Sequence, residues 1–175
     1  MTINFQVRRP VPADAQEMAR VIVDTWREAY RGLMSDAVLD DPELLGTREK
    51  FWTAALTDPK YSANTVAVAE FEGRLIGLAM SGPSLDAGGP RQLYVLYAYA
   101  AFHGSGVGTA LLDAVIDPGG PASLWVSDPN PRAQAFYRKS GFVADGSVRF
   151  EDGVRIIRMV RPAPVTGTGV DSASG

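Results

Sequence analysis

Hydrophobic and polar residues recur along the first half of the chain with two different periods. Between Pro12 and Gly32 the apolar residues are spaced as on one face of a helix, with Met18, Ile22 and Trp26 in line. Segments of strand character flank this helix. The expected elements are a strand over 5–9, this long helix, a capped turn of helix over 35–39, a helix over 42–56, and strands over 65–69 and 74–80 joined by a tight turn at 71–73.

The second half continues in the same manner and ends in a hairpin. An apolar, aromatic run from Leu93 has strand character and leads into a glycine-rich loop before another helical pattern. Asn130 followed by proline is typical of a helix start, and Gly141 of a helix end. The remaining elements are helices over 109–115 and between Asn130 and Gly141, a strand over 122–126, and strands over 143–150 and 154–160 joined by a turn at 151–153. The order is therefore β-α-α-β-β-β-α-β-α-β-β.

Composition narrows the classes of protein to which the chain can belong. Its 175 residues suffice for one domain with a sizeable core, and 46% of them are hydrophobic. With no cysteine and a single histidine, His103, we expect no metal site. The net charge of −3 argues against a nucleic-acid partner, and no apolar run reaches membrane-spanning length. The first residues lack the features of a signal peptide, so we expect a cytoplasmic protein.

The glycine-rich loop carries the most informative chemistry. The loop and its flanks read His103-Gly104-Ser105-Gly106-Val107-Gly108-Thr109. Glycines leave the neighbouring backbone N–H groups uncovered, and a helix N-terminus favours negative charge. The loop therefore predicts a site for the phosphates of a cofactor, held without lysine or metal.

The spacing of the glycines separates the known kinds of phosphate loop. A dinucleotide fingerprint G-x-G-x-x-G would need a third glycine at Thr109 or Leu111, and a P-loop would need a nearby lysine. The pattern that fits residues 103–108 is [Gln/Arg]-x-x-Gly-x-[Gly/Ala] after a strand. It resembles the acetyl-CoA loop of the GNAT superfamily of acetyltransferases. The loop departs from that pattern at its first position, where His103 stands.

A second segment is similar to the same superfamily. The family pattern N-x-x-A-x-x-F-Y-x-x-x-G-F is matched at Asn130, Ala133, Phe136, Tyr137, Gly141 and Phe142. By itself this segment is equally well explained as an ordinary capped helix with aromatic core residues. The two motifs lie one βα unit apart, in the order that the family has. Residues 26–32 (Trp-Arg-Glu-Ala-Tyr-Arg-Gly) also look like members thought to act on small molecules.

The resemblance implies a fold and an activity. The fold is an α/β (α+β) GNAT-type domain over residues 1–162, with a mixed, mostly antiparallel sheet of about seven strands and about four helices, splayed between strands 4 and 5. Residues 163–175 are expected to form a flexible tail. The implied activity is acetyl-CoA-dependent N-acetylation of a primary amine, most simply that of a small molecule. The resemblance also allows a homodimer.

The family's functional residues carry over position by position. Leu96, Tyr97 and Ala98 correspond to the strand whose exposed backbone pairs with the pantetheine arm, and a backbone N–H near Ala98 would receive the thioester oxygen. Asn130 is carried over as a cofactor contact, with the loop residues 103–109. Tyr137 is carried over as the general acid for the departing thiolate. The alternative is that its hydroxyl only positions the sulfur.

The general base is left open by the sequence. The strands beside the phosphate loop offer no carboxylate, so the nearest candidates are Glu28 and Asp128, each also explained as a solvated or capping acid. A water chain is the third candidate.

The acceptor is left open as well. Four acidic residues, Asp36, Asp40, Asp41 and Glu43, would suit a cationic amine, or form a solvated acidic face. Six aromatic residues, Trp26, Tyr30, Phe51, Trp52, Tyr94 and Tyr99, are expected to divide between an acceptor pocket and the core. The competing hypotheses are a non-catalytic acyl-CoA-binding sensor or assembly module, and a loop that holds a different nucleotide.

Overall fold

A computed structural model of the chain describes residues 2–165, and within them the strands form one seven-stranded sheet. The strand order is β1-β2-β3-β4-β5-β7-β6, and every neighbouring pair is antiparallel except β4 and β5. The strands are β1 Gln6–Arg8, β2 Thr65–Phe71, β3 Arg74–Gly82, β4 Gln92–Ala98, β5 Ala122–Ser127, β6 Val143–Glu151 and β7 Val154–Arg161. The mixed, mostly antiparallel sheet predicted from the sequence is thus confirmed.

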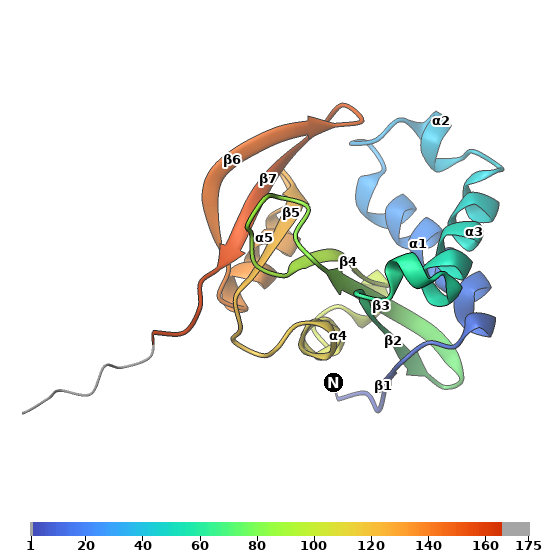
Figure 1. Ribbon diagram of the computed structural model, residues 1–175. Coiled ribbons are helices and arrows are strands. Elements are labelled where there is room, and N and C mark those ends of the chain that lie inside the picture. Colours follow the sequence, from blue (N-terminus) through green and yellow to red (C-terminus); the bar gives the residue numbers. More distant parts are fainter. Residues whose placement is uncertain (1, 166–175) are drawn as a thin grey trace, which may run out of the picture.

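Helices cover both faces of this sheet (Figure 1). The helices are α1 Ala15–Tyr30, α2 Asp36–Leu39, α3 Leu44–Thr57, α4 Val107–Val115 and α5 Pro131–Lys139, with 3-10 turns at Pro12–Asp14, Pro59–Tyr61 and Ala100–Phe102. Side chains of α1 and α3 pack with Val68, Leu75 and Leu78 in one core, and α4 and α5 pack with Ile76 and Ala79 in the other. Because successive strand residues point to opposite faces, β3 contributes to both cores and its side chains are almost wholly buried.

Two tight turns fix the register of their hairpins. Glu72 and Gly73 join β2 to β3, and Asp152 and Gly153 join β6 to β7. All four residues have positive φ, between 50° and 78°, as a two-residue turn that follows the twist of the strands requires. Each turn lies within the three-residue segment predicted from the sequence. The first residue of each segment, Phe71 or Glu151, belongs to the preceding strand.

The parallel pair β4–β5 separates soon after it begins. The ladder consists of two residue pairs, Gln92 with Ser123 and Leu93 with Leu124, although β4 continues to Ala98 and β5 to Ser127. At the same point the β3–β4 register shifts, which leaves Tyr94 as an extra residue in β4. The splay implied by the family resemblance is present, and this bulge accompanies it.

The remaining differences from the sequence prediction are small and have local causes. The capped turn predicted at 35–39 forms a separate one-turn helix, α2, because the Ser35 hydroxyl accepts a hydrogen bond from the Ala37 N–H. The described part of the chain therefore has five α-helices where about four were expected. Most of the tail predicted at 163–175 lies outside the described residues.

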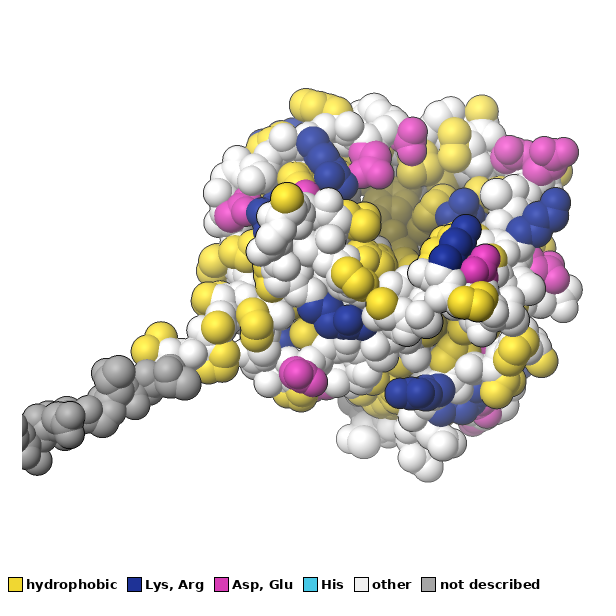
Figure 2. Space-filling model, viewed as in Figure 1, with side chains coloured by type: hydrophobic (Ala, Val, Ile, Leu, Met, Phe, Trp, Pro, Cys, Tyr) yellow, Lys and Arg dark blue, Asp and Glu magenta, His cyan; other side chains and the backbone are white. Residues whose placement is uncertain are grey.

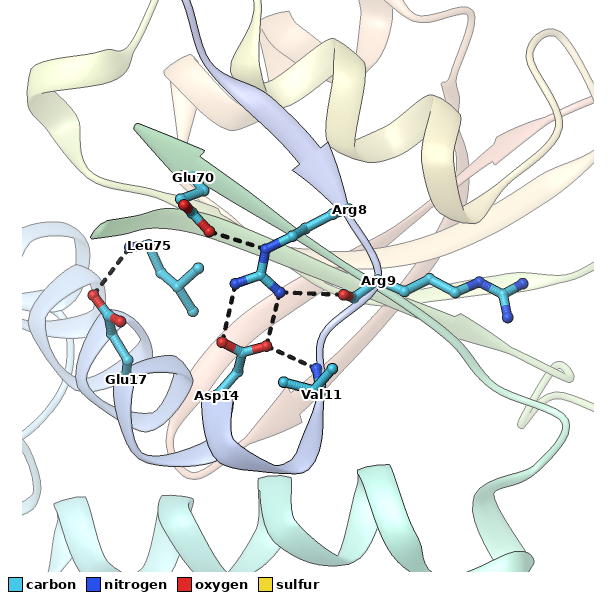
Figure 3. Close-up of polar contacts among 7 residues, drawn as sticks. All are labelled: Arg8, Arg9, Val11, Asp14, Glu17, Glu70 and Leu75. Carbon is cyan, nitrogen blue, oxygen red and sulfur yellow. Dashed lines mark hydrogen bonds and ion pairs between the residues drawn. The ribbon is translucent and has the colours of Figure 1, made fainter. Parts of the chain in front are cut away.

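The start of α1 is tied to the sheet by a cluster of charged residues (Figure 3). Two nitrogens of the Arg8 guanidinium donate to the two carboxylate oxygens of Asp14 at 2.8 and 3.0 Å, and its Nε donates to Glu70 at 2.9 Å. Asp14 also accepts the Val11 N–H, and Glu17 accepts the Leu75 N–H at 3.0 Å. The first turn of α1 is thus joined to β1, β2 and β3.

Replacement of Asp14 by Asn is expected to remove about 1–2 kcal/mol of unfolding free energy at pH 7, because it breaks a partly buried, two-pronged ion pair. The hydrogen bond from Arg8 lowers the pKa of the Asp14 carboxyl below 3.8. The stabilisation is therefore complete above about pH 4 and is lost as the pH falls through the folded-state pKa. Denaturant titrations of both proteins at pH 7 and pH 3 would measure the difference.

Asp36→Asn is the matched control, because Asp36 pairs with Arg31 at 3.0 Å while its side chain is 72% exposed. Exposed pairs of this kind contribute little, so this variant should unfold almost as the parent does. Equal losses in the two variants would contradict the role assigned to Asp14.

Candidate active site

One cleft of about 1610 Å³ runs between the α1–α3 side of the molecule and the β6–β7 hairpin. Its walls include the splayed part of β4, the start of α4 and the inner side of α5. Figure 2 shows it as a hollow with hydrophobic walls and basic side chains on either side. The residues predicted for the site from sequence that line it are Leu96, Tyr97, Ala98, His103, Gly104, Gly106, Gly108, Thr109, Asn130 and Tyr137.

The glycine loop is shaped by two left-handed backbone positions. Gly104 has φ +79° and Gly106, which precedes the first residue of α4, has φ +92°. Residues with a side chain rarely adopt these angles. A Cβ placed at either position would meet no other atom within 4 Å, so the space in front of the loop is open to the cleft.

Backbone donors at the start of α4 face that open space. The first hydrogen bond of the helix runs from the Ala110 N–H to the Gly106 carbonyl at 3.1 Å. The N–H groups of Gly108 and Thr109 therefore have no acceptor within the helix. Together with the helix dipole they provide an anion site without any basic side chain.

The side-chain positions of Gly108, Val107 and Ser105 have structural roles in the loop. Gly108 allows α4 to pass close to α5, because a Cβ there would lie 3.1 Å from the Phe136 ring. Val107 is fully buried in the core, and the Ser105 hydroxyl donates to the Phe102 carbonyl. Neither of these two residues lines the cleft.

The edge of β4 beyond Leu93 faces the cleft without a partner strand. The Tyr99 N–H bonds to Ile76 of β3, so the polar groups of Ala98, one residue earlier, face the opposite edge. There the Ala98 carbonyl lies 3.1 Å from His103 Nε2. The Leu96 and Ala98 N–H groups are left facing the gap, where an extended ligand can pair with them as a strand would. His103 thus braces the end of β4 against the loop.

Three tyrosines meet at the middle of the cleft. The hydroxyls of Tyr30 and Tyr97 lie 3.1 Å apart. Burial raises the pKa of Tyr97 well above the ordinary value of 10.0, and the nearby Tyr30 and Tyr137 raise it further. Burial, followed by the proximity of Tyr30, also raises the pKa of Tyr137. Tyr97 and Tyr137 are therefore neutral proton donors at physiological pH.

The end of α5 holds Tyr137 in place. The Gly141 N–H bonds to the Arg138 carbonyl and the Phe142 N–H to the Tyr137 carbonyl, the pairing of a Schellman motif with Gly141 at φ +94°. This brings the rings of Phe142 and Tyr137 to 5.8 Å, edge to face. At the other end Asn130 caps the helix by accepting the Ala133 N–H at 3.3 Å. The capped helix predicted from the sequence is confirmed, and it places Asn130 and Tyr137 on the cleft.

The two carboxylates considered as general bases differ in position. Glu28 lines the cleft, and its carboxylate accepts the Ala100 N–H at 3.0 Å. Asp128 does not line the cleft and is bound by Gln134 Nε2 at 3.0 Å and by Arg155. Of the two, only Glu28 can reach a molecule in the cleft.

Two of the acidic residues near α2 form ion pairs with arginines at the surface. Asp36 and Asp40 bind Arg31, Asp40 lies near Arg27 as well, and none of the four acidic residues lines the cleft. Five of the six aromatic candidates, Trp26, Tyr30, Phe51, Trp52 and Tyr94, do line it, while Tyr99 donates to Asp24 and packs in the core. Sequence reasoning missed Arg48, which also lines the cleft and which no spacing or motif distinguishes.

Comparisons with known proteins agree with this geometry. The signature of the acetyltransferase (GNAT) family matches residues 18–142. PaiA N-acetyltransferase from Thermoplasma acidophilum, solved in complex with coenzyme A, is 16% identical, with a TM-score of 0.69 over 89% of this chain and 98% of that one. A histone acetyltransferase HPA2-related protein from Corynebacterium glutamicum is 20% identical, with a TM-score of 0.69 over 95% and 100% of the two chains. A putative GNAT acetyltransferase from Desulfovibrio desulfuricans is 23% identical, with a TM-score of 0.64 over 90% and 98%.

Two further findings concern curated proteins and membrane-spanning helices. No curated protein matches the chain in sequence. None of the helices within residues 2–165 has the length and apolar character needed to span a bilayer.

The buried phenols give a testable pH dependence. Because the folded protein holds the protons of Tyr97 and Tyr137 to higher pH than the unfolded chain, unfolding free energy should fall as the pH rises past the ordinary tyrosine value of 10.0. Denaturant titrations at pH 8 and pH 10.5 should show this loss. It should be smaller in Tyr137→Phe, and an identical loss in both proteins would mean that Tyr137 ionises as freely as in the unfolded chain.

Proposed function

Because the chain belongs to the acetyltransferase (GNAT) family, it is an acetyl-CoA-dependent acyltransferase, and we propose that its acceptor is the primary amine of a small molecule. The observation that carries the proposal is the splay between β4 and β5, which opens onto the uncovered N-terminus of α4 within one cleft. The cleft continues from there to aromatic side chains of α1 and α3, where a small acceptor fits beside the reacting end of the cosubstrate.

The residues present fit acetyl-CoA. The open space in front of Gly104 and Gly106, with the N–H groups of Gly108 and Thr109, suits the pyrophosphate. The unpaired edge of β4 at Leu96 and Ala98 suits the amide groups of the pantetheine arm. When bound, acetyl-CoA supplies an acetyl group activated as a thioester.

The backbone of β4 can stabilise developing charge. An N–H donor aimed at the thioester oxygen is preorganised when its strand is held rigidly. Ala98 meets this condition, because its neighbour Tyr99 bonds to β3 and its own carbonyl is braced by His103. We assign the oxyanion contact to the Ala98 N–H.

Tyr137 is the proposed proton donor to the departing thiolate. Its side chain is 8% exposed and borders the cleft, so its proton is held at neutral pH until an acceptor of greater affinity comes close. The same low dielectric that keeps the phenol neutral raises the proton affinity of a thiolate beside it. The amine loses its own proton to Glu28 or to a water chain along the cleft.

Replacement of Gly106 by Ala tests the phosphate site. A side chain at φ +92° costs about 1–2 kcal/mol of stability and also enters the space assigned to the phosphates. We expect acetyl-CoA affinity, measured by calorimetric titration, to fall roughly tenfold or more. Gly119→Ala is the matched control, because Gly119 has φ +71° and equally open surroundings but lies outside the cleft. It should lose stability while it retains affinity, and equal affinity in the two variants would remove this loop from the site.

Replacement of Tyr137 by Phe tests the proton donor. Loss of a general acid should lower kcat by about 10²–10⁴-fold, while the dissociation constant of acetyl-CoA stays nearly unchanged. The assay follows release of free thiol in the presence of a panel of small primary amines. Full turnover in a folded Tyr137→Phe protein would remove the hydroxyl from the mechanism. A folded parent protein that binds acetyl-CoA but acetylates no small amine would contradict the proposed acceptor class.

A further inference from the structure

We infer that Arg48 binds an anionic group of the acceptor, so that the preferred substrate is an amine that also carries a carboxylate. The inference rests on the proposed acetylation of a small amine in the same cleft. It starts from the position of Arg48 on the inner side of α3. The Arg48 guanidinium carbon lies 5.6 Å from the ring centroids of both Trp26 and Phe51, and all three residues line the cleft.

Arg48 has no anionic partner within residues 2–165. It takes part in none of the ion pairs there, and its Nε is buried without a hydrogen-bond acceptor. The aromatic rings hold the guanidinium between them, which favours its charge but satisfies none of its in-plane N–H donors. A buried donor without an acceptor is uncommon in folded proteins and is costly unless a ligand completes it.

Two more unpaired donors lie on the same wall of the cleft. The indole nitrogens of Trp26 and Trp52 are buried without acceptors, and the Trp52 side chain is 1% exposed. Three N–H groups with no acceptor thus belong to residues that line the cleft. An occupant that brings negatively charged oxygen atoms suits the Arg48 guanidinium, whereas an occupant that brings only a further cation does not.

The charges around this end of the cleft favour the same occupant. Lys60 also lines the cleft, with its ammonium 4.9 Å from the Tyr61 ring centroid, and the Tyr61 ring packs 6.2 Å from that of Phe51. Of the three carboxylates that line the whole cleft, Glu28 accepts the Ala100 N–H, and Glu151 and Asp152 belong to the β6–β7 hairpin. None of these carboxylates pairs with Arg48, whose guanidinium can bind a carboxylate through two parallel hydrogen bonds.

The geometry also places the anion relative to the reacting amine. The Trp26 ring centroid lies 5.6 Å from the Arg48 guanidinium carbon and 6.5 Å from the Tyr30 ring centroid. The Tyr30 hydroxyl lies 3.1 Å from that of Tyr97, and Tyr137, the proposed proton donor, lines the same cleft. The side chains of Trp26 and Tyr30 thus connect the anion site with the tyrosines of the reaction centre. A compact amino acid, with its two charged groups a few bonds apart, spans this interval.

The test compares matched acceptors. Aliphatic and aromatic amino acids of increasing separation between amine and carboxylate are assayed beside their carboxamides and their aminophosphonic analogues. We expect kcat/KM for the best carboxylate to exceed that of its carboxamide by about 10- to 100-fold, the range of one charge-assisted contact. Aminophosphonates preferred over carboxylates would assign the site to phosphate chemistry and overturn the carboxylate assignment.

Three variants assign the preference to Arg48. Arg48→Gln should lower kcat/KM for the carboxylate about 10- to 100-fold and leave the carboxamide unaffected, while Arg48→Lys retains part of the preference through its charge. Arg20→Gln is the control, since Arg20 lies exposed on α1 outside the cleft. Calorimetric titration with the desamino carboxylate gives a second readout without turnover, and it should show binding to the parent protein and a loss of binding in Arg48→Gln.

The outcomes distinguish a failure of the role assigned to Arg48 from a failure of the proposed amine acetylation. Acetylation of amines with no preference for the carboxylate, or a preference that survives in a folded Arg48→Gln protein with normal acetyl-CoA affinity, overturns the role of Arg48 and leaves amine acetylation standing. A parent protein that binds acetyl-CoA and the desamino carboxylate but acetylates no amine supports the anion site and overturns the proposed acceptor class.

Discussion

The ladder between β4 and β5 stops at Leu93 and Leu124 although both strands continue, so the edge of β4 must find partners elsewhere. Backbone polar groups cannot be left unsatisfied in a protein interior without cost, and in the proposed mode of binding a ligand in the cleft along this edge supplies the missing partners. The bulge at Tyr94 turns β4 away at the point where its pairing with β5 ends. The chain then enters the glycine loop, and α4 begins beside the gap. A single local interruption of strand pairing thus places an open backbone edge beside the N-terminus of a helix.

The cleft pairs two electrostatic environments along its length. At the start of α4 the attraction for anions comes from backbone dipoles, whereas on α3 it comes from Arg48, held between two aromatic rings. Tyr97 and Tyr137, which also line the cleft, are neutral, because burial raises the pKa of both. The cleft thus combines neutral proton donors with two sources of attraction for anions.

The elements that could be predicted from the sequence are those whose signals are local. Paired glycine turns, the glycine loop, and the Asn130 and Gly141 ends of α5 each depend on backbone angles that few residues adopt, so a short segment identifies them. The family pattern adds the splay, which no local signal encodes. Two features were beyond prediction because they arise from contacts between distant segments. Asp128 is bound by Arg155, and Arg48 of α3 packs against Trp26 of α1. Family membership places the chain among acyltransferases, which answers the alternative of a module without activity.

The two cores on opposite faces of the sheet support different sides of the cleft. Residues of α1 and α3 in one core support the aromatic side of the cleft, while α4 and α5 in the other support the glycine loop and Tyr137. Because the first turn of α1 is fastened to the sheet through Arg8, Asp14 and Glu17, changes toward its far end need not disturb that attachment. Substitutions toward the far end of α1 and on α3 can therefore reshape one side of the cleft while the glycine loop and Tyr137 keep their support in the opposite layer.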